Sequence, residues 1–435
     1  MEKITAIKGI KDILPKDSPV WHRVELTARR IFECFGFCEI RVPIMEKTSL
    51  FQRGIGETTD IVEKEMYTFR DRDDELLTLR PEATASVIRA YIEHNLSASD
   101  PVTRLYTMGP MFRRGRPQKG RFRQFHQIDV ELFGDESPAS DAEVIFMLMH
   151  FLQSLNIENL SLEINSLGCK ACRPVFSRAV VDYLKGQESS LCPDCRRRMD
   201  VNPLRVFDCK VESCGSVIAG APRILDFLCA DCLEHFSRVK SYLNELKLTY
   251  EINPRMVRGL DYYTRTAFEV KSGELGAQNS LAGGGRYDGL VRFLGGPDVP
   301  GIGFGVGMER LIACLPPAGE VSSSADIFIA ALGERAQKIA FTLTQELRRR
   351  GICAAMDYSG KSLKSQMKRA DKLNSAYTLI FGDHAGELAN LAHAWLWPLA
   401  LLGVLAGAFG ALAATTLQGL FAYLVVLSAG TLLAA

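Results

Sequence analysis

The chain has 435 residues, with 52 Lys and Arg residues against 51 Asp and Glu residues. Net charge therefore gives no sign of a nucleic-acid partner, and any RNA-binding surface must be local. The first residues contain no apolar run of signal-peptide length, which argues against secretion and favours a cytoplasmic protein. A chain of this length is expected to form two or three domains with sizeable cores.

The N-terminal part is predicted to begin with a helix and a strand. An apolar-periodic helix starts at Ser18 and closes at Gly36, and a strand follows over residues 37–42. Residues 66–69 and 76–79 are the predicted strands of a hairpin, because a short charged turn joins them.

Later segments also carry clear patterns. Residues 140–143 have the pattern of a capping box before an apolar helix over 144–155. After a linker rich in Pro and Ser, strands are predicted over 326–332 and 377–381, with a helix over 334–350 between them. This alternation indicates a small α/β module.

A carboxylate and a hydroxyl follow the second hairpin strand directly, in Leu-Arg-Pro-Glu-Ala-Thr over residues 79–84. A carboxylate at such a place can hold the ammonium group of a ligand. A helix N-terminus with an acidic first turn is the more common use of this pattern. Taken alone, the segment favours the helix cap.

Residues 104–123 form a basic segment in which Phe112 and Phe122 are interleaved, and the part around Gly115–Gly120 has the polarity of a loop between two strands. Arginine side chains fit phosphate oxygens with paired hydrogen bonds. Composition alone favours a solvated charged hairpin equally. The seven cations are Arg104, Arg113, Arg114, Arg116, Lys119, Arg121 and Arg123.

Residues 126–131 alternate along a predicted strand, so Gln127, Asp129 and Glu131 share one face while Ile128 and Val130 share the other. An amide and a carboxylate on one face can hydrogen-bond an imidazole or an ammonium group. A half-exposed edge strand with a polar outer face is the alternative, and the pattern alone favours it.

Three glycine-containing runs follow, over residues 257–263, 282–290 and 301–311. The first two place an arginine beside glycine and tyrosine, which suits a small zwitterionic substrate held close to the backbone beside a phosphate. The third alternates glycine with apolar residues and would let ATP approach closely. Tight packing of a strand–helix turn, and of a tyrosine pair in the core, are the structural alternatives. The chain lacks a P-loop motif, which excludes P-loop chemistry.

Residues 166–240 form a separate Cys-rich insertion that holds eight of the 12 cysteines. Three Cys-x-x-Cys pairs and a fourth, wider pair could build one or two structural four-thiolate zinc sites. Buried free thiols and labile disulfides are the alternatives. The candidate ligands are Cys169, Cys172, Cys192, Cys195, Cys209, Cys214, Cys229 and Cys232.

The arginine loop and the three glycine runs, in this order, resemble histidyl-tRNA synthetase, a class II aminoacyl-tRNA synthetase, over about residues 1–383. The resemblance implies an α+β catalytic domain with an antiparallel sheet over 1–320. It further implies a partial anticodon-binding domain over 325–383. The helix and strand over 18–43 resemble the motif that forms the homodimer interface in this family.

The resemblance also implies roles for single residues. Arg113 would clamp the ATP α-phosphate, and Arg258 would bridge that phosphate and the histidine carboxylate, so these two are the expected catalytic cations. Arg116 and Gln118 would lie on the loop that approaches the tRNA acceptor end. The expected histidine-binding residues are Glu82, Ala83, Thr84, Arg113, Gln127, Glu131, Arg258, Tyr262 and Tyr263, and the expected ATP-binding residues are Arg113, Arg121 and Arg310.

The activity implied is activation of L-histidine by ATP with Mg²⁺, followed by transfer of histidine to tRNA(His). A histidine-sensing regulatory subunit of ATP phosphoribosyltransferase is the alternative. Such a paralogue is expected to have lost ATP-clamping arginines and the anticodon module. Arg113, Arg258 and Arg310 are present, so the synthetase is favoured. A membrane-tethered scaffold using the zinc insertion is a third reading, and it depends on the tail alone.

Residues 384–435 depart from the resemblance, because no Asp, Glu, Lys or Arg occurs after residue 387. Stretches over about 395–414 and 417–435 are long enough to span a bilayer. Three interpretations remain: a shifted reading frame or misjoined gene, a membrane anchor, or part of a soluble core. The first is favoured over the second, and a core is the weakest, because the run has no polar face for water. A membrane partner follows only if the tail is genuine.

Overall fold

The protein is described here by a computed structural model, which covers residues 3–56, 59, 61–115, 120–209, 211–257, 262–275, 279–316 and 325–382. Its internal contacts separate two compact units, Met1–Ala318 and Gly319–Ala435. The predicted tail over 384–435 lies outside the described residues. In the part of the chain that is described, no helix is both long and apolar enough to cross a membrane.

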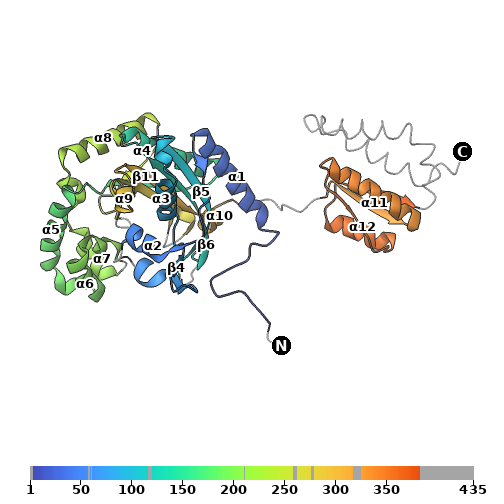
Figure 1. Ribbon diagram of the computed structural model, residues 1–435, viewed down its shortest axis with the longest axis horizontal. Helices are drawn as coiled ribbons and strands as arrows, with labels where there is room; N and C mark the ends of the chain where they lie inside the picture. Colours follow the sequence, from blue (N-terminus) through green and yellow to red (C-terminus); the bar gives the residue numbers. More distant parts are fainter. Residues whose placement is uncertain are drawn as a thin grey trace. The chain divides into compact units, whose positions relative to one another are not determined.

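An eight-stranded sheet forms the centre of the first unit (Figure 1). Neighbouring strands pair antiparallel from β5 through β6, β11, β10 and β9 to β7. At the two edges of the sheet, β1 pairs with β5 and β8 pairs with β7 in parallel. The sheet is therefore mixed, and the expected antiparallel sheet was wrong at both edges. The strands, in spatial order, are β1 (Cys38–Glu39), β5 (Thr103–Phe112), β6 (Gln124–Phe133), β11 (Gly301–Gly307), β10 (Ser280–Arg286), β9 (Thr264–Ser272), β7 (Leu160–Ser166) and β8 (Glu251–Ile252).

Strand β6 lies inside this sheet, between β5 and β11, so the edge-strand alternative was wrong. Ile128 and Val130 are fully buried in the larger hydrophobic core on one face. Helices α1 (Ser18–Cys34), α4 (Pro138–Ser154) and α10 (Met308–Ala313) contribute to that core. The alternation predicted for β6 therefore leaves its polar side chains on the opposite face.

Helix α3 (Thr84–Glu93) packs into the smaller core that contains Phe133 and Tyr287. The predicted hairpin is confirmed as β3 (Tyr67–Arg70) and β4 (Leu76–Leu79), which pair antiparallel. Strand β2 (Met45–Lys47) completes a three-stranded sheet beside them, and α2 (Thr48–Ile55) contacts α3. Because α3 begins just after β4, the hairpin places the first turn of α3. Shorter helical elements of this unit are Ile61–Glu65, Leu96–Ala98, Gly273–Leu275 and α9 (Leu290–Phe293).

Helix α4 begins at Pro138, so the capping box predicted over 140–143 was wrong. The Ser137 side chain caps the helix by accepting from the Ala139 N–H at 3.2 Å. A proline in the first turn suits this early start, because its fixed φ is helical and it has no N–H to satisfy. Asp141 is thereby free of a capping role and points into the core instead.

Asp141 and Arg286 form a fully buried ion pair that joins α4 to β10. His235, on α8 (Ala230–Glu245), contacts the other Asp141 oxygen at 2.8 Å. Although burial raises the pKa of Asp141, the Arg286 guanidinium and His235 hold it below its ordinary value. The sequence pattern places Arg286 in a run suited to a substrate. Its burial and partners assign it to the fold.

The Cys-rich insertion has a small core of its own, which includes Phe176, Val180 and Leu184. Its helices lie to one side of the large sheet (Figure 1). They are α5 (Cys172–Lys185), α6 (Pro193–Val201), α7 (Glu212–Ala219) and the short elements Glu188–Ser190, Pro203–Asp208 and Ile224–Phe227, and the chain returns to the sheet through α8.

The second unit is a parallel three-stranded sheet in the order β13 (Ala354–Met356), β12 (Ile327–Leu332), β14 (Tyr377–Gly382). Alternate residues of β12 pack in two separate clusters, one with α11 (Glu334–Arg349) and one with α12 (Leu363–Lys372). The predicted strands and helix are confirmed. Each face of β12 therefore has a helix packed against it.

We predict that Arg286→Met lowers the free energy of unfolding by about 3–5 kcal/mol, because Asp141 would stay buried without its cation. The matched control is Arg292→Met, since Arg292 pairs with Asp298 at the surface, and this change should cost less than about 1 kcal/mol. Urea denaturation followed by circular dichroism measures both variants. Equal losses in the two variants would contradict the structural role of Arg286.

Candidate active site

Glu82 lies at the start of α3 and is buried, with 3% of its surface exposed. Its carboxylate accepts from the backbone N–H groups of Thr84, at 3.0 Å, and Ala85, at 2.9 Å. Glu82 therefore satisfies two N–H groups at the start of α3 from the position before the N-cap residue Ala83, whereas the first turn itself contains no acidic residue. A carboxylate offers about four acceptor positions, so these two bonds leave capacity for a ligand ammonium. Ala83, also buried, is the residue before α3.

Strand β6 presents its polar side chains toward α3. The Gln127 amide donates to Asp129 at 2.7 Å. Glu131 accepts from the Tyr287 hydroxyl and also hydrogen-bonds the Thr84 side chain. The second oxygen of Asp129 is buried, and among the described residues it has no hydrogen-bond partner. These side chains form, with Glu82, one buried group that we call the polar cluster: Glu82, Thr84, Gln127, Asp129, Glu131, Tyr262 and Tyr287.

Two glycines of β11 make room for this arrangement. Gly303 lies opposite Glu131 in the sheet register, and Gly305 lies opposite Asp129. A Cβ atom at Gly305 would overlap the Gln127 amide, and one at Gly303 would overlap the Glu131 carboxylate. The glycines therefore give space to neighbouring protein side chains, a use that the alternating sequence pattern did not identify.

Three tyrosine rings lie close together, and two of them, Tyr262 and Tyr287, belong to the polar cluster. The Tyr262 ring lies 4.7 Å from that of Tyr263 and 5.8 Å from that of Tyr287, centroid to centroid. Tyr262 also hydrogen-bonds Thr84, and burial raises its pKa well above its ordinary value, so its hydroxyl stays neutral. Tyr263 is 6% exposed and belongs to the smaller core. Tyr287 lies within the second glycine run, 282–290, but the sequence did not single it out as a site residue.

Of the two expected catalytic cations, the structure describes Arg113, which lies close to Glu82 of the polar cluster. It donates to the Pro81 carbonyl at 2.8 Å and lies over the Phe125 ring at 5.3 Å. Burial lowers its pKa, while Glu65 and Glu82 oppose that change. A guanidinium nevertheless remains charged at neutral pH. Arg113 therefore places a fixed positive charge beside Glu82.

Arg310 occupies a different place, at the junction of β11 and α10. It donates to the Ser280 carbonyl at 2.6 Å, and burial and the nearby positive charge of Arg121 lower its pKa. Arg121 is exposed. Arg116, Gln118 and Arg258 lie outside the described residues.

The polar cluster gathers three carboxyl groups away from water. Burial raises the pKa of Glu82, Asp129 and Glu131, and for Glu131 the value is about 8. Such groups favour a bound cation, because an ammonium or imidazolium would replace the missing water. The arrangement suits a ligand that brings positive charge to β6 and negative charge to Arg113.

The eight insertion cysteines form two clusters. Cys169, Cys172, Cys229 and Cys232 make the neck cluster, and Cys192, Cys195, Cys209 and Cys214 make the distal cluster, with the sulfurs of each within 4.8 Å of one another. Measured Sγ–Sγ distances are 3.7 and 3.8 Å in the neck cluster and 3.9 Å in the distal cluster. A tetrahedral zinc site with bonds of about 2.3 Å has edges of about 3.8 Å. All eight are free thiols, so disulfide pairing is not found among them, and the clusters fit metal binding.

Comparison with known proteins identifies the family. A family model described as histidyl-tRNA synthetase matches residues 9–179 and 211–311. A histidine--tRNA ligase from Desulfosudis oleivorans is 56% identical over 387 residues, covering 88% of this chain and 92% of the relative. The chain belongs to the histidyl-tRNA synthetase family. An anticodon binding domain model matches residues 326–389, which extends slightly beyond the expected end of the resemblance at 383.

Solved structures agree with this assignment. The apo histidyl-tRNA synthetase of S. aureus has a TM-score of 0.75 at 39% identity, over 88% of this chain and 93% of that one. A structure described as an ATP phosphoribosyltransferase regulatory subunit/histidyl-tRNA synthetase, from Bacillus halodurans, has a TM-score of 0.65 at 19% identity, over 88% and 100%. The second likeness shows the fold alone. Fold therefore does not separate synthetase from regulatory paralogue, whereas sequence identity to the ligases favours the synthetase.

We predict that Glu131→Gln changes stability in a pH-dependent way. Burial raises the pKa of Glu131 from its ordinary 4.5 to about 8, so the folded state keeps a proton that the unfolded state releases in this window. Folding stability of the native chain therefore falls between these pH values, and the Gln variant avoids that loss. Its advantage should grow from pH 4.5 to 8 and then level off.

Urea denaturation of both chains at several pH values measures this difference. Glu245→Gln is the control, because Glu245 is exposed and its replacement should have little effect on stability. A stability difference that stays constant across the window would contradict the raised pKa of Glu131.

Proposed function

We propose that this chain is a histidine–tRNA ligase. It joins L-histidine to ATP, releasing pyrophosphate and forming histidyl-adenylate, and then transfers histidine to the 3′ end of tRNA(His). The observation that carries this proposal is the polar cluster, where side chains from α3, β6 and the two tyrosine-containing runs meet on one face of the sheet. Four separate stretches of sequence supply it, which a merely structural network would not require.

Each part of histidine has a suitable partner in the cluster. Glu82, Thr84 and Gln127 would hold the ammonium group, since buried carboxylates favour a cation. Glu131 and Tyr262 would hydrogen-bond the imidazole nitrogens, with Tyr263 beside them. An amino acid without those nitrogens would leave buried polar groups unpaired, which is a strong basis for rejection.

The ATP side of the reaction requires positive charge. The carboxylate attacks the α-phosphorus, and negative charge gathers on the phosphorus oxygens, where preplaced cations stabilise it most. Arg113 would clamp the α-phosphate and Arg258 would bridge it to the histidine carboxylate. Arg310 would stack on adenine near the γ-phosphate, with Arg121 nearby. Mg²⁺ prefers oxygen ligands and supplies further charge on the phosphates when bound, and Glu269, close to Arg310, offers such a ligand.

The remaining parts of the chain serve the RNA. We assign catalysis to residues 1–320, with the insertion over 166–240, and anticodon binding to residues 325–383. Helix α12 and the turn before it expose a row of basic side chains suited to RNA phosphates: Lys361, Lys364, Lys368, Arg369 and Lys372. Arg116 and Gln118 would approach the acceptor end. A cytoplasmic homodimer formed through the segment 18–43 is the proposed assembly, and the tail over 384–435 is proposed to come from a shifted reading frame.

The two cysteine clusters are proposed to hold one structural Zn²⁺ each. Four thiolates complete a tetrahedral zinc site and leave no open position for catalysis. Their sulfur spacing supports this proposal. The metal of the neck cluster would connect chain segments 60 residues apart, whereas that of the distal cluster would connect segments 17 residues apart.

The activity is tested by histidine-dependent ATP–pyrophosphate exchange. Arg258→Ala should lower the exchange rate at least about a hundredfold while the chain stays folded, because a transition-state cation is lost. Arg255→Ala is the matched control, an exposed arginine three residues away, and should keep near-normal exchange. Near-normal exchange in Arg258→Ala would refute the assignment, and absence of exchange in the native chain would refute the function.

Zinc content is tested by elemental analysis of the purified chain. Two zinc ions per chain are expected, and Cys195→Ser should reduce this to one, because it removes a single ligand from the distal cluster. A metal-free chain that folds normally, with its eight insertion thiols open to thiol reagents, would contradict structural zinc.

A further inference from the structure

The neck cluster joins the two ends of the insertion. Cys169 and Cys172 follow β7, and Cys229 and Cys232 lie where the chain enters α8. Besides the short sulfur distances, the Cys172 sulfur accepts from the Cys229 N–H at 3.1 Å. Two passes of the backbone that are about 60 residues apart are thereby held side by side.

Residues that flank the entering cysteines hold the backbone next to Tyr262. The Gly168 carbonyl accepts from the Arg265 N–H at 2.9 Å and from the Thr264 hydroxyl at 3.0 Å. The Leu167 N–H donates to the Arg265 carbonyl at 2.6 Å. Three hydrogen bonds therefore connect residues 167–168, just before Cys169, to residues 264–265, just after the tyrosine pair.

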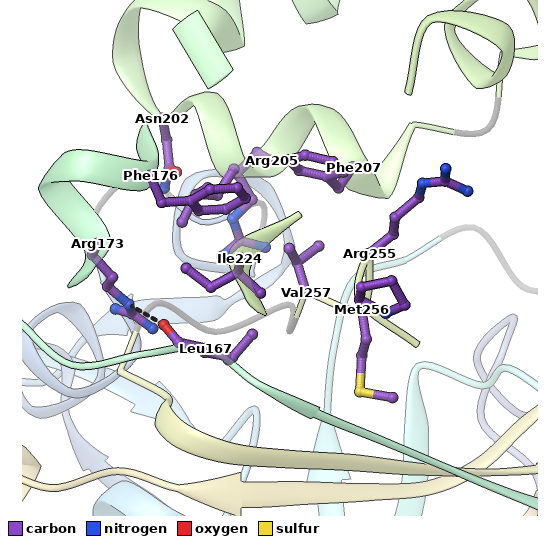
Figure 2. A pocket seen from close by; sticks show the side chains of 12 residues that line it. Leu167, Arg173, Phe176, Asn202, Arg205, Phe207, Ile224, Arg255, Met256 and Val257 are labelled. Atoms are coloured by element: carbon purple, nitrogen blue, oxygen red, sulfur yellow. Dashed lines mark hydrogen bonds between the residues drawn. The ribbon is translucent and has the colours of Figure 1, made fainter. Parts of the chain in front are cut away.

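Arg173, which directly follows Cys172, makes the most direct connection. Its guanidinium donates to the Tyr263 carbonyl and to the Leu167 carbonyl, the latter at 3.5 Å. Figure 2 shows Arg173 directed toward Leu167, at the edge of a cavity of about 210 Å³ that Phe176, Ile224 and neighbouring side chains line. This cavity does not include the polar cluster, so Arg173 acts from outside the proposed histidine site.

A second series of contacts connects the neck cluster to the polar cluster, starting from Cys232 on α8, where the chain leaves the insertion. His235 lies three residues after Cys232 on α8, and both are buried. His235 contacts Asp141, and Asp141 pairs with Arg286. Arg286 precedes Tyr287, whose hydroxyl donates to Glu131. Both chains of contacts that start at the neck cluster therefore reach tyrosines of the proposed histidine site, Tyr263 and Tyr287.

We infer that the neck cluster with its metal positions the tyrosines for histidine, with Arg173 as the positioning residue, whereas the distal cluster stabilises only the insertion. A metal–thiolate cross-link restricts the chain ends that it joins. A shift of about 1 Å in a positioning group can cost about a hundredfold in rate. The inference rests on the proposed histidine site and on metal binding by the clusters.

The experiment measures L-histidine affinity by titration calorimetry and the KM values for histidine and ATP by pyrophosphate exchange, with zinc content determined for each full-length variant. Arg173→Met and Cys232→Ser should each weaken histidine binding at least about tenfold, with the KM for ATP changed less than about twofold. Arg173→Lys, which keeps a donor, should recover part of the loss. Cys195→Ser, the matched distal variant, should lose one zinc ion and bind histidine normally.

Several outcomes would overturn the inference. One is normal histidine affinity in Arg173→Met, which does not depend on the cysteine variants folding. Another is an equal loss in Cys195→Ser and Cys232→Ser, because it would mean that the insertion acts only through its overall stability. Tyr262→Phe separates the two levels of the argument. If the native chain binds histidine and Tyr262→Phe weakens binding, but Arg173→Met does not, the proposed function stands and this inference fails.

Discussion

The catalytic unit depends on one buried carboxylate. Asp141 forms an ion pair with Arg286 of the central sheet and a hydrogen bond with His235 of α8, the helix that follows the insertion. Charges without access to water are costly unless they are paired and fully hydrogen-bonded, so this group tolerates few alternative arrangements. The pairing sets α4, β10 and α8 against one another. It also brings the run containing Tyr287 beside β6, where the polar cluster forms.

The polar cluster itself works against folding. Three carboxylates that burial makes hard to ionise lie near two fixed cations, Arg80 and Arg113. Such a site is less favourable when empty than when a cationic ligand fills it, so the proposed binding of histidine would also stabilise the fold. The apolar core on the other face, around Ile128 and Val130, offsets this cost. One strand therefore packs in the core on one side and carries the polar cluster on the other.

Local patterns predicted much of this arrangement. The period-two alternation of 126–131 placed the polar side chains of β6 correctly, because side-chain direction in a strand is a local property. The hairpin over 66–79 and the helix over 334–350 were also predicted correctly, because turn residues and helical periodicity are local properties of the sequence. The predictions were wrong where contacts between residues far apart in the chain determine the local structure. The capping box at 140–143 has the right residue types, yet α4 begins earlier, at Pro138 with Ser137 as its cap. Asp141 then lies in the first turn and pairs with Arg286, far along the chain.

By itself, the sequence determined the family, the order of the motifs and the candidate residues, because these are set by residue type and spacing. Only the tertiary structure decided which residues share a site. It brought Tyr287 into the polar cluster, removed Arg286 from it and sorted eight cysteines into two sets of four. Spacing alone allows one or two sites and many pairings. Distances between segments far apart in the chain follow from how the elements pack, which no local pattern encodes.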